Sequence, residues 1–526
     1  MSQARPNQPF DFPRAAVPDV VLGAAEVQGD RPALVDAVSG ETISYRTLTE
    51  LVSRVAGGLA ASGLRRGDVV AMYAPNSILF PVACLAAMRA GATVTLANPL
   101  YKPDELAAQL RDCGAAHVVT VGALVPNALA AGAREVFLLD RLDGYRSIRD
   151  LDGDPPDPTS DPTVDWETEL ALLAYSSGTT GVPKGVMLSH ANITANILQM
   201  AHAMRVEPAT RVLAVLPMFH AYGFTAMLCL SLYAGATIVV LPRFDLAQFL
   251  GAISTHRITR VLVAPPIAVA LARHPLVDEY DLSSLEQILS SAAPLDPETA
   301  AAVQRRIGVP VVQAFGLTEA SPSVFVPPAG ELPPPGSVGK PLPGTEIRLV
   351  SPEDGRDATS GELYVRGPQV MRGYLGRPAE TAEMIDADGW LHTGDIARVD
   401  DDGWFYITGR VKELIKYKGY QVAPAELEGV LRGHPAVADA VVVGAPDGDG
   451  NEIPLAFVVT APGATPDPDE IMSYVAERVA PYKKVRQVEF ISEIPRSPAG
   501  KVLRRQLPSW SGLRPRDGRH EELMER

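Results

Sequence analysis

Short apolar runs alternate with amphipathic segments over about the first 350 residues, and this alternation limits the possible folds more than any other feature of the chain. Residues 69–75 and 93–99 read as strands, and residues 78–91 and 102–114 read as helices. Further along, Asp296 is the predicted N-cap of another helix. Strands that alternate with helices form parallel sheets whose two faces are both covered. We therefore predict an α/β fold, with a large N-terminal domain of parallel sheets covered by helices.

The pattern changes twice toward the C-terminus. After about residue 335, turns rich in Gly and Pro separate short β-runs, which indicates a β-rich subdomain over about residues 335–409. The predicted large N-terminal domain therefore spans residues 1–409. From residue 410 the order reads β-α-β-β-α-β, which predicts a small, mobile α+β domain over residues 410–508. Residues 509–526 read as a polar tail.

Composition and charge exclude several classes of protein. The chain has 526 residues and a net charge of −15, which disfavours nucleic-acid binding because such proteins need a basic face. Residues 1–19 lack the apolar core of a secretion signal. Three widely spaced cysteines form neither a disulfide framework nor a metal pattern: Cys84, Cys113 and Cys229. We therefore expect a cytoplasmic protein with no nucleic-acid partner; the sequence does not indicate its oligomeric state.

Residues 212–242 are the one stretch that invites a membrane interpretation. They carry no formal charge, and about 20 apolar residues suffice to span a bilayer. However, Pro217, Gly223 and Gly235 interrupt the stretch, and its two ends read as short buried strands. We expect a buried strand–loop–helix–strand unit and no membrane span.

A loop rich in glycine and hydroxyl groups, residues 175–185, gives the strongest functional signal. It reads YSSGTTGVPKG and follows a predicted strand. Glycines let a backbone turn tightly and present N–H groups to an anion, hydroxyls add donors, and Lys184 adds a positive charge. The Walker A spacing cannot be fitted to it. The sequence therefore predicts a phosphate-binding loop of another kind.

This loop resembles the phosphate loop of the adenylate-forming superfamily, which comprises acyl- and aryl-CoA synthetases, nonribosomal adenylation domains and firefly luciferases. Blocks similar to five further family motifs follow in the family's order: PMFHAYG (217–223), QAFGLTE (313–319), GWLHTGD (389–395), GRVKELIKYKGYQ (409–421) and PRSPAGK (495–501). Through KELIKYKGYQVAPAELE the chain most resembles the 4-coumarate:CoA ligases. The resemblance covers nearly the whole chain.

The resemblance implies an enzyme that activates a carboxylic acid with ATP and Mg²⁺. The acid becomes an acyl-adenylate with release of pyrophosphate, and the thiol of CoA then displaces AMP. The partners implied are therefore a small carboxylic acid, ATP and CoA.

The resemblance also assigns residues to ATP and to the metal. Those implied to bind ATP or AMP are Ser176, Ser177, Gly178, Thr179, Thr180, Lys184, Gln313, Ala314, Phe315, Thr318, Asp395, Arg410 and Lys412. Asp395 would accept hydrogen bonds from the ribose hydroxyls, and Lys412 lies at the family's hinge. The residues implied to neighbour Mg²⁺ are Thr180 and Glu319.

The remaining roles concern the reaction, CoA and the acid. The residues implied for catalysis are Lys501, Lys416, Gln421 and His220. Those implied for CoA are Arg243, Lys418 and Gly419. Those implied for the acid are His220, Tyr222, Ser291, Ala292, Gly316 and Val326.

The identity of the acid is open at this stage. The block PMFHAYG has no Asp that could hold a substrate ammonium, so an α-amino acid is disfavoured. An aromatic propenoic acid of the 4-coumarate or cinnamate kind is the first choice, and a medium-chain fatty acid is the competitor, because a methylene or two changes binding only modestly. Another alternative keeps the ATP chemistry but uses nitrite to diazotise an aryl amine. A non-catalytic scaffold is disfavoured because the implied ATP-binding and catalytic side chains are retained.

Overall fold

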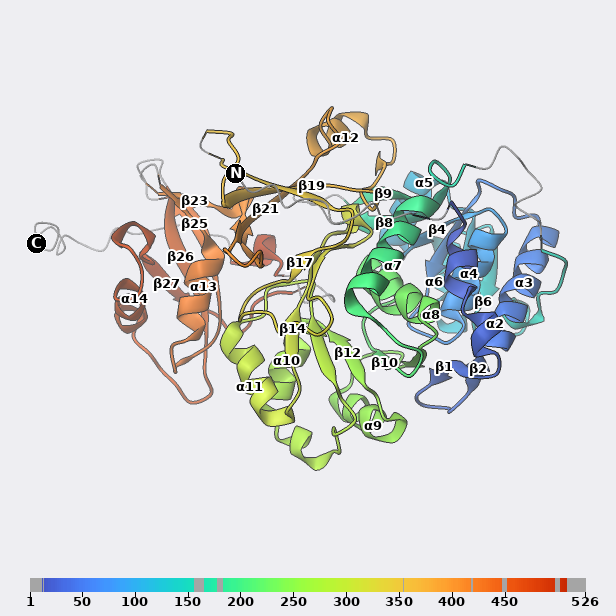
Figure 1. Ribbon diagram of the computed structural model, residues 1–526, viewed down its shortest axis with the longest axis horizontal. Helices are drawn as coiled ribbons and strands as arrows, with labels where there is room; N and C mark the ends of the chain where they lie inside the picture. The colour runs from blue at the N-terminus through green and yellow to red at the C-terminus, as the bar shows by residue number, and fades with distance from the viewer. Residues whose placement is uncertain are drawn as a thin grey trace, which may run out of the picture. The chain divides into compact units, whose positions relative to one another are not determined.

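The computed structural model consists of two compact units, residues 1–407 and residues 408–526, which we describe separately (Figure 1). The structure describes residues 12, 14–155, 165–176, 183–352, 354–417, 420–446, 452–496 and 502–508.

A large mixed sheet organises the first part of unit 1. In spatial order its strands are β20 (Gly373–Tyr374), β9 (Lys184–Ser189), β8 (Leu170–Ser176), β4 (Thr93–Leu96), β3 (Val69–Tyr73), β5 (His117–Thr120), β6 (Glu135–Leu138) and β7 (Arg146–Ser147). The strands from β8 to β7 are parallel, as the alternating pattern predicts, whereas β9 runs antiparallel to both β8 and β20.

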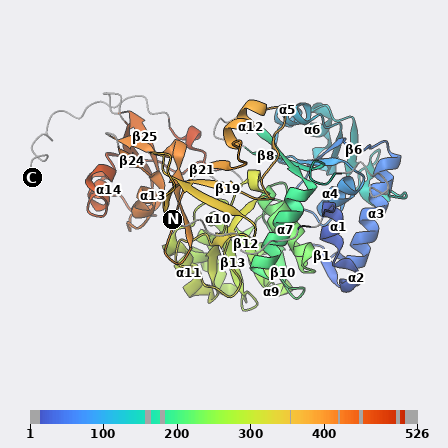
Figure 2. The ribbon, with the colours of Figure 1, turned by 45° about the horizontal axis from the view of Figure 1, so that its top comes forward.

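Helices cover both faces of this sheet, because alternate residues of its strands point to opposite sides. Val70 and Met72 face a core that includes α3 (Tyr45–Ala61) and α4 (Phe80–Arg89). Ala71 and Tyr73 face a second core with α5 (Pro103–Cys113) and α6 (Val125–Ala130). Figure 2 shows the two helix pairs on opposite sides of the strands.

A second sheet lies in the same unit and is also mainly parallel. Its strand order is β14 (Val311–Gln313), β13 (Gln287–Ser290), β12 (Arg260–Val263), β10 (Arg211–Ala214), β11 (Thr237–Val240), β1 (Pro32–Asp36) and β2 (Thr42–Ser44), of which only β2 is antiparallel to its neighbour. One face packs on α9 (Leu246–His256), α10 (Pro265–Arg273) and α11 (Pro297–Ile307) (Figure 1). The Asp296 carboxylate accepts a hydrogen bond from the Thr299 N–H at 2.8 Å, which confirms the predicted N-cap of α11.

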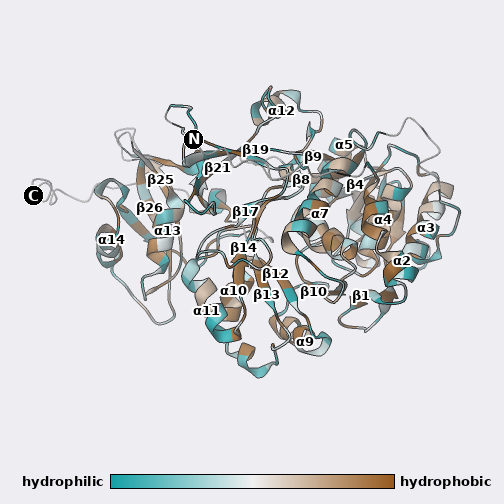
Figure 3. Cartoon of the chain, viewed as in Figure 1, coloured by the Kyte–Doolittle hydropathy of each residue, from teal (hydrophilic) through white to brown (hydrophobic). Residues whose placement is uncertain are grey.

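The other face of the second sheet joins the core that covers the first sheet. Leu262, Leu289 and Val312 belong to that common core. The common core also contains α7 (His190–Met204), whose first turn is capped by Ser189: its Oγ accepts from the Asn192 N–H, and its own N–H donates to the Asn192 side chain. Figure 3 shows hydrophobic residues gathered on the inner strands and on the helix faces turned toward them.

The uncharged stretch 212–242 is the predicted strand–loop–helix–strand unit inside this core. It contains most of β10, a π-helical segment (Tyr222–Cys229), α8 (Leu230–Tyr233) and β11. Over the residues that the structure describes, no helix is both long enough and apolar enough to cross a membrane.

Short antiparallel strands already occur before residue 335, the predicted start of the β-rich region. Strands β15 (Phe315–Gly316), β16 (Ser323–Val326) and β17 (Lys340–Pro341) form one small antiparallel sheet. A second has the order β18 (Glu346–Val350), β19 (Ser360–Arg366), β21 (Leu391–Val399) and β22 (Phe405–Arg410). Helix α12 (Pro378–Met384) lies between β20 and β21 along the chain.

Unit 2 is a small α+β body. Strands β25 (Val437–Pro446), β26 (Glu452–Thr460) and β27 (Gln487–Phe490) form its sheet, and α13 (Pro424–Arg432) and α14 (Pro468–Ala476) share a core with it. The segment read as the first strand is a hairpin of two short strands, β23 (Ile415–Tyr417) and β24 (Tyr420–Val422).

Candidate functional site

A buried carboxylate lies beside the two strands that flank the glycine-rich loop. Glu319 is on a short 3-10 turn (Thr318–Ala320) and is 8% exposed. Its Oε1 accepts two hydrogen bonds, one from Ser176 Oγ at 3.0 Å and one from the Tyr374 hydroxyl at 2.9 Å. The ammonium of Lys184 lies 5.0 Å from the centre of the Tyr374 ring, which places a cation on the ring's negative face. We call these four residues the Glu319 cluster.

Backbone pairing brings the members of the Glu319 cluster together from distant parts of the chain. Ser176 ends β8 and Lys184 begins β9, and the two are register partners. Strand β20 pairs with the other edge of β9, so that Tyr374 lies opposite Val186. The Glu319 turn is held in place by the Met371 N–H, which donates to the Glu319 carbonyl oxygen at 2.9 Å.

The chemistry of the Glu319 cluster suits a divalent cation and phosphate. Both hydrogen bonds of Glu319 go to Oε1, so Oε2 has no partner among the described residues. Burial, followed by the Glu319 charge, raises the pKa of Tyr374 far above its usual value, so the hydroxyl remains a donor. No group of three or more His, Cys, Asp or Glu forms a metal cage in the described part of the chain. Mg²⁺ typically takes only one or two carboxylates together with phosphate and water, so this donor set fits it.

A second group of predicted residues lies where β13 and β14 end. Ser291 follows β13 and its hydroxyl donates to the Ala314 carbonyl at 2.8 Å. The next residue, Ala292, has a φ of +73°. This conformation is energetically unfavourable for any residue that has a Cβ atom. The Gln313 side-chain oxygen accepts from the Leu295 N–H at 2.8 Å. Gln313, which the resemblance assigns to ATP, thus uses this oxygen to hold the segment after β13.

Of the predicted acid-binding residues, Tyr222 packs against the common core and contacts this segment, and His220 lies two residues before Tyr222 in the chain. The Tyr222 hydroxyl donates to the Leu289 carbonyl at 3.4 Å. The His220 ring lies 4.6 Å from the Phe219 ring, centre to centre. Burial lowers the pKa of His220 to about 4, so its imidazole is neutral at physiological pH. His220 can therefore exchange hydrogen bonds with a ligand but adds no positive charge.

Gly316 and its neighbours connect the two groups. A Cβ built on Gly316 would lie 2.2 Å from the Pro322 carbonyl oxygen, so only glycine fits this close approach of two strands. Phe315 packs 5.9 Å from Phe325, and Thr318 leads directly into the Glu319 turn. Val326, predicted to contact the acid, is a buried core residue of β16.

Two further predicted residues of unit 1 lie elsewhere on its sheets. Asp395 is buried in β21, where its N–H donates to Thr393 Oγ at 3.1 Å, and Thr393 in turn donates to the Leu363 carbonyl. Arg243, predicted for CoA, is exposed shortly after β11.

Several predicted residues are described only in part or not at all. Those outside the described residues are Ser177, Gly178, Thr179, Thr180, Lys418, Gly419 and Lys501. Lys416 and Gln421 are register partners in the β23–β24 hairpin, and their side chains are also outside the description. Arg410 ends β22 and Lys412 lies in the following 3-10 turn, both in unit 2.

Tyr374 is the functional candidate that sequence reasoning missed. It touches both a predicted metal neighbour and a predicted phosphate-binding lysine, yet it belongs to none of the recognised blocks. The only signal in the sequence was a Gly-Tyr pair in a region of short strands, and that signal is weak.

Comparisons with known proteins identify the family of the chain. The AMP-binding enzyme family matches residues 23–375, and the C-terminal domain of AMP-binding enzymes matches residues 426–501. The chain is 42% identical to 4-coumarate--CoA ligase-like 9 of Oryza sativa subsp. japonica, over 94% of both chains. It is 37% identical to peroxisomal OPC-8:0-CoA ligase 1 of Arabidopsis thaliana, over 92% of this chain and 91% of that one.

A solved structure shows the same fold. ATP-bound MatB from Rhodopseudomonas palustris superimposes with a TM-score of 0.84 at 29% identity, over 93% of this chain and 98% of that one. Both family matches fall in the expected order along the chain, and the first alone spans more than half of it. The chain therefore belongs to the AMP-binding enzymes, the adenylate-forming family that its motifs resemble.

Proposed function

We propose that this protein activates an aromatic carboxylic acid of the 4-coumarate or cinnamate kind with ATP and transfers the acyl group to CoA. The broader activity, that of an AMP-forming acid:CoA ligase, is supported by the family and by relatives that are named CoA ligases. The observation that carries the proposal is the Glu319 cluster, which joins a buried carboxylate to both ends of the glycine-rich loop.

In the first step, an oxygen of the acid's carboxylate attacks the α-phosphorus of ATP. A carboxyl-oxygen–phosphorus bond forms, the bond to the β-phosphate bridge breaks, and pyrophosphate leaves. Negative charge collects on phosphoryl oxygens, so cations and donors that are already in position lower the barrier. Lys184, Ser176 and the hydroxyls of Ser177, Thr179 and Thr180 would supply them. When bound, Mg²⁺ neutralises phosphate charge, and Glu319 Oε2, together with Thr180, would hold it.

In the second step, the thiolate of CoA attacks the acyl carbon. The carbon–sulfur bond forms, the carbon–oxygen bond to the phosphate breaks, and AMP leaves. Asp395 and Arg410 would hold the ribose, Phe315, Gln313 and Ala314 would border the adenine, and Lys501 would act on the first step. Arg243, Lys418 and Gly419 would meet CoA, and Lys416 and Gln421 would border the path of the thiol.

The acid would lie along the surface formed by His220, Tyr222, Ser291, Ala292 and Gly316, which we call the acid slot. Three observations support an aromatic acid here: the aromatic side chains of Phe219 and Tyr222, the neutral state of His220, and a relative named for 4-coumarate. No acidic residue is among the residues of the slot, which argues against a substrate that carries an ammonium group. A medium-chain acid is the second candidate, because a hollow with several apolar side chains in its wall lies on the other side of Leu289.

The test is ATP–pyrophosphate exchange with cinnamates, benzoates and unbranched fatty acids, followed by detection of the acyl-CoA after CoA is added. We expect exchange with 4-coumarate or cinnamate, and a thioester only when CoA is present. Exchange that is faster with fatty acids would favour the second candidate. The proposal would be rejected if none of the carboxylic acids supported exchange and the protein instead formed AMP in the presence of nitrite and an aryl amine.

A further inference from the structure

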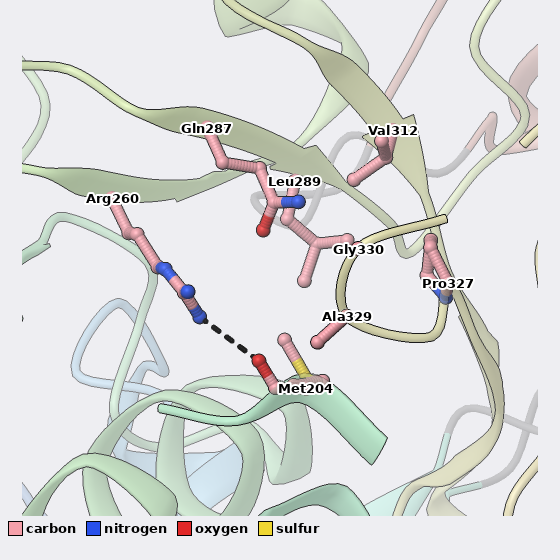
Figure 4. A pocket seen from close by; sticks show the side chains of 8 residues that line it. All are labelled: Met204, Arg260, Gln287, Leu289, Val312, Pro327, Ala329 and Gly330. Atoms are coloured by element: carbon pink, nitrogen blue, oxygen red, sulfur yellow. Dashed lines mark hydrogen bonds between the residues drawn. The ribbon is translucent and has the colours of Figure 1, made fainter. Parts of the chain in front are cut away.

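A small hollow of about 90 Å³ opens beside the second sheet of unit 1 (Figure 4). Four apolar side chains, Met204, Leu289, Val312 and Pro327, form much of its wall, and Arg260 and Gln287 add two polar groups. Arg260 begins β12 and Gln287 begins β13, so both polar groups lie at the N-terminal ends of parallel strands. Met204 is the last residue of α7.

The hollow lies on the face of the sheet that also bears the acid slot. Alternate residues of a strand share a face, so Gln287, Leu289 and Ser291 point the same way. Gln287 pairs in register with Arg260, and Leu289 pairs with Val312. The Leu289 carbonyl accepts from Tyr222 of the acid slot, whereas its side chain lines the hollow. Leu289 is therefore the boundary between the two.

The distance along this face of the sheet sets the length of a ligand that could occupy both the acid slot and the hollow. Ser291 and Gln287 are four residues apart on an extended chain, which corresponds to about 13 Å at the rise of a strand. An unbranched acid of about ten carbons spans a similar length. Such an acid could have its reacting carboxylate at the nucleotide end and its far end beside Arg260.

Arg260 has donors to spare at this position. Its Nη1 donates to the Met204 carbonyl at 3.3 Å, which clasps the C-terminal end of α7. Its Nε is buried and has no hydrogen-bond partner within the described part of the chain. Among the residues that the structure describes, no carboxylate forms an ion pair with Arg260. The hydrogen bond to the Met204 carbonyl uses one of the five N–H donors of the Arg260 guanidinium. The planar arrangement of the remaining donors suits a carboxylate.

Two charged groups lie around Arg260 at longer range. Burial lowers the pKa of Arg260, whereas the charges of Glu286 and Glu207 raise it. Both glutamates are exposed, so solvent screens their repulsion of an incoming anion. The hollow therefore combines a polar lining, to which a few apolar side chains are added, with a cation that forms no ion pair with any described carboxylate.

We infer that the hollow is the far end of the acid slot, and that Arg260 with Gln287 receives a carboxylate at the distal end of the substrate. The substrate is then an elongated unbranched dicarboxylic acid, which extends the medium-chain candidate and takes the place of the 4-coumarate kind, and only its end at the nucleotide is activated. This inference rests on the proposed acid activation. The same carboxylate chemistry could also be supplied by a separate small anion beside a shorter acid, and the experiment below distinguishes these two sources.

The experiment compares matched pairs of unbranched mono- and dicarboxylic acids, with chain lengths on either side of about ten carbons. The readout is the ratio of kcat/KM for the diacid to that for the matching monoacid in ATP–pyrophosphate exchange. The wild-type ratio should peak near the length that reaches Arg260. Arg260→Gln should lower that peak by roughly ten- to hundred-fold, the usual effect of losing a hydrogen bond to a charged group. Arg260→Lys should lower it less.

Arg211→Gln is the matched control. Arg211 also begins a parallel strand at this edge, is half-buried and donates to a main-chain carbonyl, that of His256, but it does not line the hollow. Its substitution should leave the ratio unchanged, and thermal unfolding of each variant reports whether it is folded.

Three outcomes decide the inference. A diacid advantage that Arg260→Gln abolishes supports it. If diacids have no advantage but added inorganic phosphate or acetate changes monoacid exchange in the wild type and not in Arg260→Gln, the anion site exists and the substrate class is wrong. If Arg260→Gln changes neither the diacid-to-monoacid ratio nor the effect of added anions, the inference is overturned while acid activation stands. If none of the acids tested supported exchange, the proposed function itself would be overturned.

Discussion

The hydroxyl of Tyr374 offers a sharp test of the Glu319 cluster. Tyr374→Phe removes one hydrogen bond to Glu319 Oε1 and keeps the aromatic ring beneath the Lys184 ammonium. A hydrogen bond to a charged group contributes about 1.5–3 kcal/mol, and each 1.4 kcal/mol corresponds to about tenfold in rate. Because Ser176 still donates to the same oxygen, we expect the lower half of that range, about a tenfold slower adenylation.

The assay separates the two half-reactions. ATP–pyrophosphate exchange, measured over a range of Mg²⁺ concentrations, reports adenylation, and thioester formation from a supplied acyl-adenylate reports the second step. Tyr374→Phe should slow exchange and raise the Mg²⁺ concentration needed for half-maximal rate, since a looser Glu319 holds the ion less well. Thioester formation from the supplied adenylate needs no pyrophosphate chemistry and should stay near the wild-type rate.

Tyr406→Phe is the control for a generic loss of stability. The Tyr406 hydroxyl donates to Asp400 Oδ2 at 2.8 Å, which is the same type of pair, and neither residue is assigned to the site. It should leave both half-reactions and the Mg²⁺ dependence unchanged. If Tyr374→Phe behaved like Tyr406→Phe, or slowed both half-reactions equally, the role of Tyr374 in positioning Glu319 would be refuted.

Two further predictions concern the site, and a third concerns a buried histidine of α7. Asp395→Ala should raise the KM for ATP by roughly ten- to hundred-fold in steady-state kinetics, because two ribose hydroxyls lose a charged acceptor; an unchanged KM would reject the ribose assignment. Lys501→Ala should slow pyrophosphate release but not thioester formation from a supplied adenylate, and an equal loss in both would contradict its assignment to the first step. Burial lowers the pKa of His190 to about 3, against about 6.5 in the unfolded chain. The unfolded form therefore binds the extra proton, and the free energy of unfolding should fall by up to about 1.4 kcal/mol per pH unit below about pH 6.5. Thermal unfolding from pH 8 to pH 5 should show a smaller fall for His190→Gln, and equal pH dependence would contradict this.

The fold followed from periodicity because local pattern and tertiary structure agree. The run Val94–Leu96 is buried on both faces of its sheet, as an uninterrupted apolar strand predicts, and Asp296 caps its helix through a contact three residues away. The β23–β24 hairpin was harder, because two strands of three residues leave almost no periodicity to detect.

Site residues could be predicted where they belong to contiguous sequence blocks. They could not be predicted where strand pairing across the sheet determines which residues come into contact. The glycine-rich loop and Glu319 each belong to a recognisable block. Tyr374, in contrast, meets Glu319 across 55 residues of sequence, because β20 adds to the edge of β9. The same applies to Arg260 and Gln287, which adjoin only through strand register.

The central claim is that a carboxylate oxygen of the substrate becomes bonded to the α-phosphorus of ATP. The most direct test uses an acid labelled with oxygen-18 in its carboxylate, incubated with the enzyme, unlabelled ATP and CoA, and mass spectrometry of the products. If an acyl-adenylate forms and the thiol then cleaves its carbon–oxygen bond, AMP must carry one labelled oxygen and pyrophosphate none. Unlabelled AMP, or label found in pyrophosphate or inorganic phosphate, would contradict the account.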